Sequence, residues 1–194
     1  MTIELKKITK EELNEVLRLH RMWLELKEGG VIADLSHTDL SGMDLRYAPL
    51  TGAILRYADL SNANLRYATL RGAFLRKSIL IGASIQCADL SWANMIEANL
   101  TRAGLCTTNL YHTILCKANL SKADLCQADM SFADLEGADL TDAKLALANL
   151  SSANLSNTDL SVAHLNDTKL NRANLSNTDL SGIELVGNNS SNDE

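Results

Sequence analysis

Leucine recurs at almost every fifth position between Ala33 and Leu185, and this apolar pattern sets the organisation of the chain. The stretch contains 31 consecutive five-residue units without an insertion, and the central residue is leucine in 28 of them. The exceptions are Ile85, Met95 and Met130. Two positions before the centre the residue is alanine in 22 units, and otherwise mostly threonine or serine. An unbroken repeat of this kind decides the architecture before any other feature is considered.

A period of five excludes both a straight helix and a straight strand. Five residues advance roughly 140° around an α-helix, so successive leucines would scatter around its surface and leave no apolar stripe. In a flat strand, an odd step sends successive leucines to opposite faces. The conflict disappears if the chain turns a corner once in each unit. The alanine and the leucine then point the same way from a short extended segment, and the remaining residues form the corner and face water.

Units such as Ala58-Asp59-Leu60 and Ala118-Asn119-Leu120 resemble the pentapeptide-repeat family, whose motif is written A(D/N)LXX. The resemblance covers about four fifths of the chain. It implies an all-β solenoid, a right-handed quadrilateral β-helix whose stacked coils pair their backbones about 4.8 Å apart. We therefore predict a β-helix of about eight coils over residues 31–187, with leucine lying over leucine in a narrow core.

Residues 1–30 are predicted to form an arm and a capping helix. Thr9 and Glu12 have the spacing of a capping box, and apolar residues follow at helical spacing from Leu13. The pair Gly29-Gly30 is expected to end the helix. A solenoid needs such a lid because an open strand edge over an apolar core invites aggregation. The lead-in from His20 to the first repeat also resembles that of many cyanobacterial family members.

The opposite end carries no comparable helix in the sequence. Residues 188–194 are polar and are predicted to be a disordered tail. Two alternatives stay open for the last coil. Its own polar ladder can end it, or two copies can meet end to end through residues near Ile183 and Leu185, as many family members do.

Charge and hydropathy point to a soluble cytoplasmic protein. The net charge of −6 combines +2 over residues 31–80 with −7 over residues 131–194. No apolar run approaches the roughly 20 residues that span a bilayer, and the N-terminus has no signal-peptide core. We expect no membrane association and no direct nucleic-acid binding. The four cysteines suit a reducing compartment.

Neither catalysis nor a cofactor is expected. His37, His112 and His164 fall on different coils and faces, so none can orient a nucleophile. A filled tube also offers no pocket that excludes water. Cys106 and Cys126 stack in adjacent coils, but their parallel side chains place the Cβ atoms slightly too far apart for a disulfide. Without a CxxC or Cys/His spacing, we expect free thiols and no metal.

Residues twenty apart stack in one column, so the outer surface can be read from the sequence. Outward apolar residues gather on neighbouring faces, which a core cannot explain, and such surfaces commonly bind partners. The candidate partner-binding residues are Ile54, Phe74, Ile79, Ile81, Ile96 and Ile114. The alternative is a set of isolated surface residues, or a docking place for the N-terminal arm.

Two further columns contain aromatic residues. Trp92, His112 and Phe132 stack with Tyr111 beside them, which either stabilises one face or binds a ligand. Arginines and tyrosines around Arg46 and its column favour charge pairing with nearby aspartates over nucleic-acid binding.

An acidic face is predicted near the C-terminal end. Its residues are Asp134, Asp139, Asp142, Asp159 and Asp179. Some family members are rod-shaped DNA mimics that inhibit type II topoisomerases such as gyrase through such a face. Those proteins usually carry many phenylalanines at the central position, whereas this chain has none there and is basic in its N-terminal half. The first hypothesis is therefore a non-enzymatic scaffold that binds an unidentified protein. The alternative is a DNA-mimicking modulator of gyrase.

Overall fold

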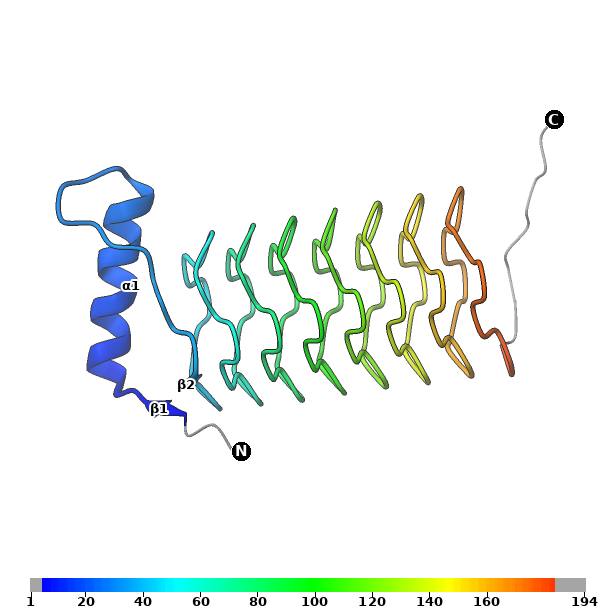
Figure 1. Cartoon of the computed structure of the whole chain (residues 1–194), viewed down its shortest axis with the longest axis horizontal. Helices are drawn as coiled ribbons and strands as arrows, with labels where there is room; N and C mark the ends of the chain where they lie inside the picture. The colour runs from blue at the N-terminus through cyan, green and yellow to red at the C-terminus, as the bar shows by residue number, and fades with distance from the viewer. Residues whose placement is uncertain (1–4, 184–194) are drawn as a thin grey trace.

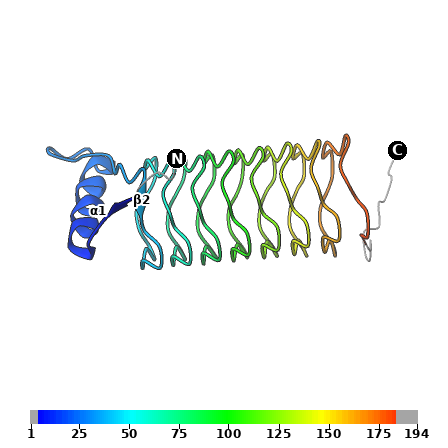
Figure 2. The ribbon, with the colours of Figure 1, turned by 60° about the horizontal axis from the view of Figure 1, so that its bottom comes forward.

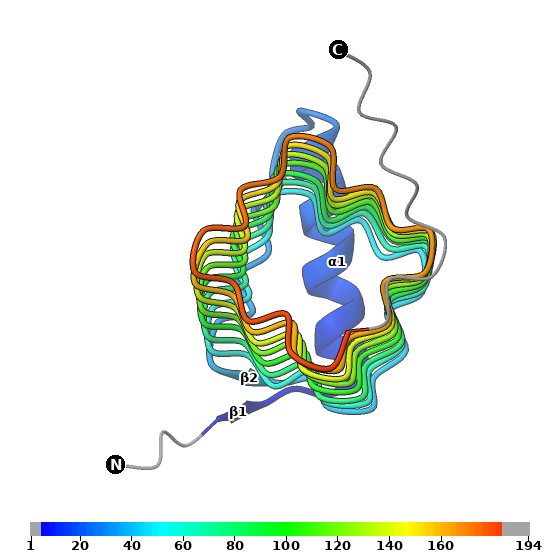
Figure 3. The ribbon, with the colours of Figure 1, turned by 90° about the vertical axis from the view of Figure 1, so that its right-hand side faces the viewer.

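The computed structural model describes residues 5–183, which form a rod of stacked coils with one helix across its N-terminal end (Figures 1 and 2). Viewed along the rod, each coil has a four-sided outline, and the sides of successive coils lie over one another (Figure 3). The sequence-based prediction of a β-helix is confirmed. The tail at 188–194 and Leu185 lie outside the described residues.

Parallel backbone pairing at a spacing of twenty residues holds the coils together. Ile54 pairs with Phe74, for example, and Asn99 pairs with Asn119. The Leu100 amide donates to the Asn119 carbonyl at 2.7 Å, and the Asn119 amide donates to the Ala98 carbonyl at 2.9 Å. Each side of a coil thus contributes one rung to a continuous parallel ladder. The ladder satisfies the backbone hydrogen-bonding groups even though each side is too short to form a long strand.

Every corner places one residue in the left-handed region. In the corner after Leu50, Gly52 has a φ of 69°, and the Ala53 amide donates to the Leu50 carbonyl at 3.0 Å. A positive φ at only the second central residue is typical of a type II turn. Tyr47 and Trp92 occupy the equivalent position with φ of 59° and 62°. Non-glycine residues rarely adopt this conformation, so the ladder on both sides of each corner must maintain it.

The aspartate or asparagine of the motif caps the corner that follows it. Oδ1 of Asp129 accepts from the Ser131 amide at 3.1 Å and from the Ser131 hydroxyl at 2.6 Å. Oδ1 of Asn119 accepts from the Ser121 amide in the same way, at 2.9 Å. This is an Asx turn, and it explains why the position before each leucine accepts Asp or Asn.

Alanine and leucine fill the tube. Leu100, Leu105 and their equivalents are fully buried, and the alanines beside them are almost as inaccessible. Where threonine replaces alanine after the first coil, its hydroxyl bonds to a carbonyl of the preceding coil. Thr113 donates to the Leu90 carbonyl at 2.8 Å, and Thr168 donates to the Leu145 carbonyl at 2.8 Å. The position two before the leucine therefore requires a small side chain, and a threonine there can form a hydrogen bond through its hydroxyl.

The N-terminal segment closes the first coil. Strand β1 (Lys6–Lys7) pairs in parallel with β2 (Thr38–Asp39), and α1 (Lys10–Leu24) lies across the open end (Figure 3). The capping box is confirmed, since the Thr9 amide donates to Glu12 Oε2 at 2.8 Å and the Glu12 amide donates to Thr9 Oγ1 at 3.1 Å. Apolar residues of this segment contact the core, namely Ile8, Leu13, Val16 and Leu17.

The prediction that the helix ends at Gly29-Gly30 was wrong. The helix stops at Leu24, because Leu26 adopts a left-handed φ of 55° and its amide donates to Trp23 while Lys27 donates to Met22. This pair of bonds is a Schellman motif, usually built on glycine. Gly30 has a different role, since it allows the returning chain to run directly against the helix backbone.

His20 joins the helix to the first coil. Its ring is fully buried and stacks on the ring of Trp23, with the two ring centroids 5.5 Å apart. Its Nδ1 accepts a hydrogen bond of 3.1 Å from the Ala33 amide. Burial lowers the pKa of His20, with a smaller opposing effect from the backbone of Thr51. Nε2 is buried without a hydrogen bond of good geometry among the described residues. The site therefore holds the neutral ring.

We expect the cap to loosen in acid. Because the folded pKa of His20 lies below its unfolded value, the unfolded state binds more protons, and stability falls as the pH drops below about 6.5. Amide hydrogen exchange of α1 should accelerate between about pH 7 and pH 5 once corrected for intrinsic rates. In His20→Asn, which keeps an acceptor but cannot titrate, this acceleration should disappear. An equal acceleration in the variant would contradict the role of His20.

The described C-terminal end is less enclosed. Leu180 is 46% exposed, and Ile183 is only partly buried against the core. At this end the sequence left two alternatives open, closure by the coil's own polar ladder or a contact between two copies, and both stay predictions. Among residues 5–183, no helix has the length and apolar character needed to cross a membrane.

Candidate functional site

Four aromatic side chains in mutual contact follow one corner of the rod. We call Trp92, Tyr111, His112 and Phe132 the aromatic corner. The rings of Trp92 and His112 stack at 4.2 Å, those of His112 and Phe132 stack at 5.1 Å, and Tyr111 contacts all three edge-on. Trp92 and Phe132 are 51% and 50% exposed. The predicted stacking is confirmed, and it fixes three rings in a rigid outward ladder.

Glycines extend this corner towards the cap. Gly52 and Gly72 precede Trp92 in the same column, so no side chain fills the space between Trp92 and α1. Trp23 of α1 enters this space, and its Cη2 lies 4.0 Å from where a Cβ of Gly52 would stand. The result is a largely apolar hollow of about 420 Å³. It is lined by Trp23, Leu24, Leu26, Thr51, Gly52, Arg71, Gly72 and Trp92.

The hollow was not predicted from the sequence. The signal was the pair of glycines in register with the aromatic column, but the position of Trp23 over them depends on how α1 docks. A polar groove of about 430 Å³ adjoins the hollow, since Arg71 and Trp92 line both. Asp89, Asn109 and Asp129 line its other side. One exposed corner therefore combines rigid aromatic rings, an apolar recess and polar groups.

The six apolar candidates all point outward but form a less continuous surface. Phe74, Ile79, Ile81 and Ile114 are 37–38% exposed, and Ile54 and Ile96 are partly buried. The column from Ile54 to Ile114 is interrupted by Asn94, which pairs with Phe74 and with Ile114. The Arg56 guanidinium lies 5.1 Å from the ring centre of Phe74 and partly covers it.

The expected pairing of the arginines with nearby acids is confirmed in part. Among the described residues, Arg46 and Arg76 form ion pairs, whereas Arg56 and Arg66 lie against the rings of Phe74 and Tyr67. Arg46 donates to Asp44 at 2.7 Å, and this hydrogen bond lowers the pKa of Asp44 to about 2. Arg76 and Lys77 both contact Glu97, at 3.2 and 3.1 Å. These side chains are exposed, so the pairs contribute little to stability.

The acidic column forms as predicted at the other end of the rod. Asp139 pairs with Asp159, and Asp159 pairs with Asp179, so the three carboxylates stack at the coil spacing. Each accepts a corner amide, from Thr141, Ser161 and Ser181, respectively. Hydrogen bonds from Ser161 lower the pKa of Asp159. Of the other acidic candidates, Asp134 accepts the Glu136 amide and Asp142 lies 3.5 Å from His164.

The histidines of the rod are separated as expected. His37 stacks on Tyr57, His112 belongs to the aromatic corner, and His164 approaches Asp142.

The repeats match a known family along most of the chain. The family described as Pentapeptide repeats matches eight copies in segments that together cover residues 33–182. The chain belongs to the pentapeptide-repeat family. No curated protein matches it.

Solved structures of other pentapeptide-repeat proteins are similar to this one. HetL of the cyanobacterium Nostoc sp. strain PCC 7120, involved in heterocyst differentiation regulation, is 31% identical over 78% of each chain, with a TM-score of 0.36. Rfr23 of the cyanobacterium Cyanothece 51142 is also 31% identical, over 53% of this chain and 64% of its own, with a TM-score of 0.32. The resemblance to cyanobacterial members is confirmed at the level of sequence.

QnrB1, a plasmid-mediated fluoroquinolone resistance protein, is 22% identical over 79% of each chain, with a TM-score of 0.48.

Proposed function

We propose that this pentapeptide-repeat protein is a non-enzymatic interaction module, a rigid right-handed rod that binds a protein partner through its aromatic corner. The observation that carries the proposal is the stacked ladder of Trp92, His112 and Phe132, whose two outer rings are half-exposed. Large aromatic side chains are the residues that most often dominate binding energy at protein interfaces. Here the ladder already fixes their rotamers, so little side-chain entropy remains to be lost on binding.

The hollow beside Trp92 also supports the aromatic corner as the binding face. Recesses next to exposed aromatic rings receive anchoring side chains of a partner, and this recess is apolar with one arginine at its border. The patch around Phe74 is the second candidate face. Arg56 and Asn94 reduce its continuous apolar area, so we rank it below the aromatic corner.

The alternative function is DNA mimicry towards a type II topoisomerase through the acidic face. Its specific support is the column of Asp139, Asp159 and Asp179 at regular spacing. The net charge of +2 over residues 31–80 opposes it, because a long DNA mimic requires negative charge along most of its length.

A capture experiment with matched variants separates the faces. The bait is the tagged full chain, in lysate of the source organism, followed by direct binding to each purified captured protein. Trp92→Asn/Phe132→Asn removes the outer rings while retaining a residue type that tolerates a positive φ. Phe74→Ser/Ile79→Ser alters the second face. Asp139→Asn/Asp159→Asn/Asp179→Asn removes charge but keeps the oxygens that accept the corner amides.

We expect a partner that binds the wild type and the Asp→Asn triple variant, and whose affinity falls at least about 30-fold, or about 2 kcal/mol, in Trp92→Asn/Phe132→Asn. Loss in the Phe74 variant alone would move the interface to the second face. Capture of gyrase that depends on the three aspartates would favour DNA mimicry and overturn the proposal.

A further inference from the structure

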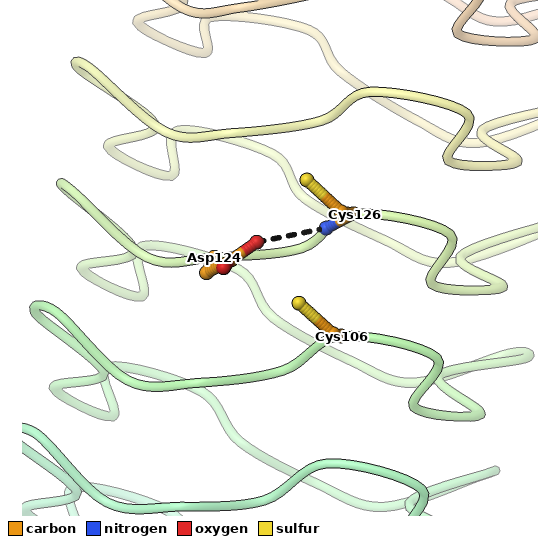
Figure 4. Close-up of side chains that lie close together, drawn as sticks. All are labelled: Cys106, Asp124 and Cys126. Carbon is orange, nitrogen blue, oxygen red and sulfur yellow. Dashed lines mark hydrogen bonds between the residues drawn. The ribbon is translucent and has the colours of Figure 1, made fainter.

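Two cysteines and an aspartate converge on another corner of the rod. Cys106 and Cys126 are stacked one coil apart, and the Thr107 amide next to Cys106 donates to the Cys126 carbonyl at 3.0 Å. Asp124 lies two residues before Cys126, and its Oδ1 accepts the Cys126 amide at 3.3 Å. The two Sγ atoms and a carboxylate oxygen all lie within 4.8 Å of one another (Figure 4).

The three groups shift one another's pKa. Burial raises the pKa of the Cys106 thiol to about 12, and a hydrogen bond to Asp124 adds to the shift. The pKa of Cys126 is raised for the same reasons. Burial opposes ionisation of Asp124, but hydrogen bonds from both thiols hold the pKa of its carboxyl below the usual value. The pKa shifts therefore favour protonated thiols beside an ionised Asp124.

The coil below the cluster contains an unsatisfied oxygen. Gln86 precedes Cys106 in the same column, and its side-chain amide occupies the space that a Cβ would need at Gly104. Gly104 pairs with Asp124 in the ladder. Gln86 Oε1 is buried and accepts no hydrogen bond within the described part of the chain. A buried carbonyl oxygen without a donor is costly, and a cation would satisfy it.

We propose that Cys106, Asp124 and Cys126 form a binding site for a thiophilic divalent cation of the Zn²⁺ class, with Gln86 Oε1 or a water as the fourth ligand. Two sulfurs and one carboxylate oxygen suit Zn²⁺, whereas Mg²⁺ and Ca²⁺ prefer oxygen alone. A tetrahedral centre with metal–sulfur bonds of about 2.3 Å needs sulfurs roughly 3.8 Å apart. The two sulfurs lie within 4.8 Å of each other, so side-chain rotation has to bring them closer by at most about 1 Å.

The stacking also disfavours a disulfide between these two cysteines. In-register neighbours of a parallel ladder place their Cβ atoms at about the coil spacing of 4.8 Å, beyond the usual 3.5–4.5 Å of a disulfide. Both thiols are free in the structure. A metal ion can bind both sulfurs at the existing coil spacing, without the two coils moving closer together. Each thiol loses its proton to solvent, and the resulting thiolate donates an electron pair to the metal.

The proposal departs from the sequence-based expectation of free thiols without a metal. Motif searches rely on ligands close in sequence, but here the two cysteines are separated by one full coil. The site becomes visible only when the chain is read in steps of twenty residues. The charged neighbour in the ladder is Lys144, which pairs with Asp124 from the coil above and helps to keep it ionised.

Metal titration of the full chain under reducing conditions tests the site. We expect Zn²⁺ to bind by calorimetry with one ion per chain. Co²⁺ should give thiolate charge-transfer absorption and the visible bands of tetrahedral coordination. Cys106→Ser/Cys126→Ser should abolish both signals, and Asp124→Asn should weaken Zn²⁺ binding at least about tenfold. Circular dichroism checks that each variant retains the β-helix.

The matched control uses the other two cysteines of the chain. Cys87→Ser/Cys116→Ser should bind Zn²⁺ with unchanged stoichiometry and give the same Co²⁺ spectrum. Because two thiol protons are released, the apparent affinity should rise up to about 100-fold per pH unit. Equal loss of binding in the control variant, or Zn²⁺ binding that survives Cys106→Ser/Cys126→Ser, would overturn the assignment. So would the absence of binding to the wild type.

Discussion

Replacing Leu145 by alanine is expected to lower the free energy of unfolding by about 2–5 kcal/mol. Leu145 is fully buried among the leucines and alanines of adjacent coils, so its truncation loses apolar burial and leaves a cavity. The ladder on both sides fixes the backbone, since the Leu145 amide donates to His164 at 2.9 Å and its carbonyl accepts from Thr168. The coils therefore cannot collapse far into the cavity. Urea denaturation followed by circular dichroism measures the loss.

Leu147 provides the control for the same substitution two residues away. Its side chain is 55% exposed, and its φ of 61° places it at a corner. Alanine and leucine meet a similar penalty at this φ, so Leu147→Ala should change the free energy of unfolding by less than about 0.5 kcal/mol. Similar losses at Leu145 and Leu147 would refute the assignment of inward and outward positions.

The fold was predictable because the repeat constrains every coil in the same way. With a period of five, two positions of each unit face inward: the leucine and the small residue two positions before it. The Asx turn then selects the residue between them, as Asp129 and Asn119 show. Each unit thus reports the same local structure, and the resemblance to the pentapeptide-repeat family supplied the closure of four units into one coil. The capping box of α1 was equally local.

Features that depend on contacts between separate elements were not predictable. The end of α1 is set by the conformation of Leu26, where a glycine-based signal pointed five residues further on. The hollow at the aromatic corner depends on Trp23 docking over Gly52. The thiol cluster depends on the spacing of side chains across coils, and on Gln86 filling the space at Gly104. For the hollow and the thiol cluster, the column register was readable from the sequence, but the side-chain positions were not.

Replacing Gly30 by alanine should detach the cap. A Cβ at this position would lie 2.6 Å from both the Met22 carbonyl carbon and the Trp23 Cα, closer than real Cβ atoms approach backbone. The helix would have to move away from the returning chain, which is bonded to it through the Val31 amide and the Leu19 carbonyl at 3.1 Å. We expect a loss of about 3 kcal/mol in cap docking, at the upper end of overpacking costs.

Detachment of α1 would also expose the first coil. Leu35, which is now almost fully buried, would face solvent beside an unpaired parallel edge, a combination that favours association between copies. Gly30→Ala should therefore show fast amide hydrogen exchange throughout α1 and concentration-dependent oligomers by size-exclusion chromatography. Gly72→Ala is the matched control. It has a φ of 63° and no atom within 4 Å of the added Cβ, so it should cost only about 1 kcal/mol of backbone strain and leave the cap docked. If Gly30→Ala stayed monomeric with a protected α1, the close approach of the two segments would not be what seals this end of the rod.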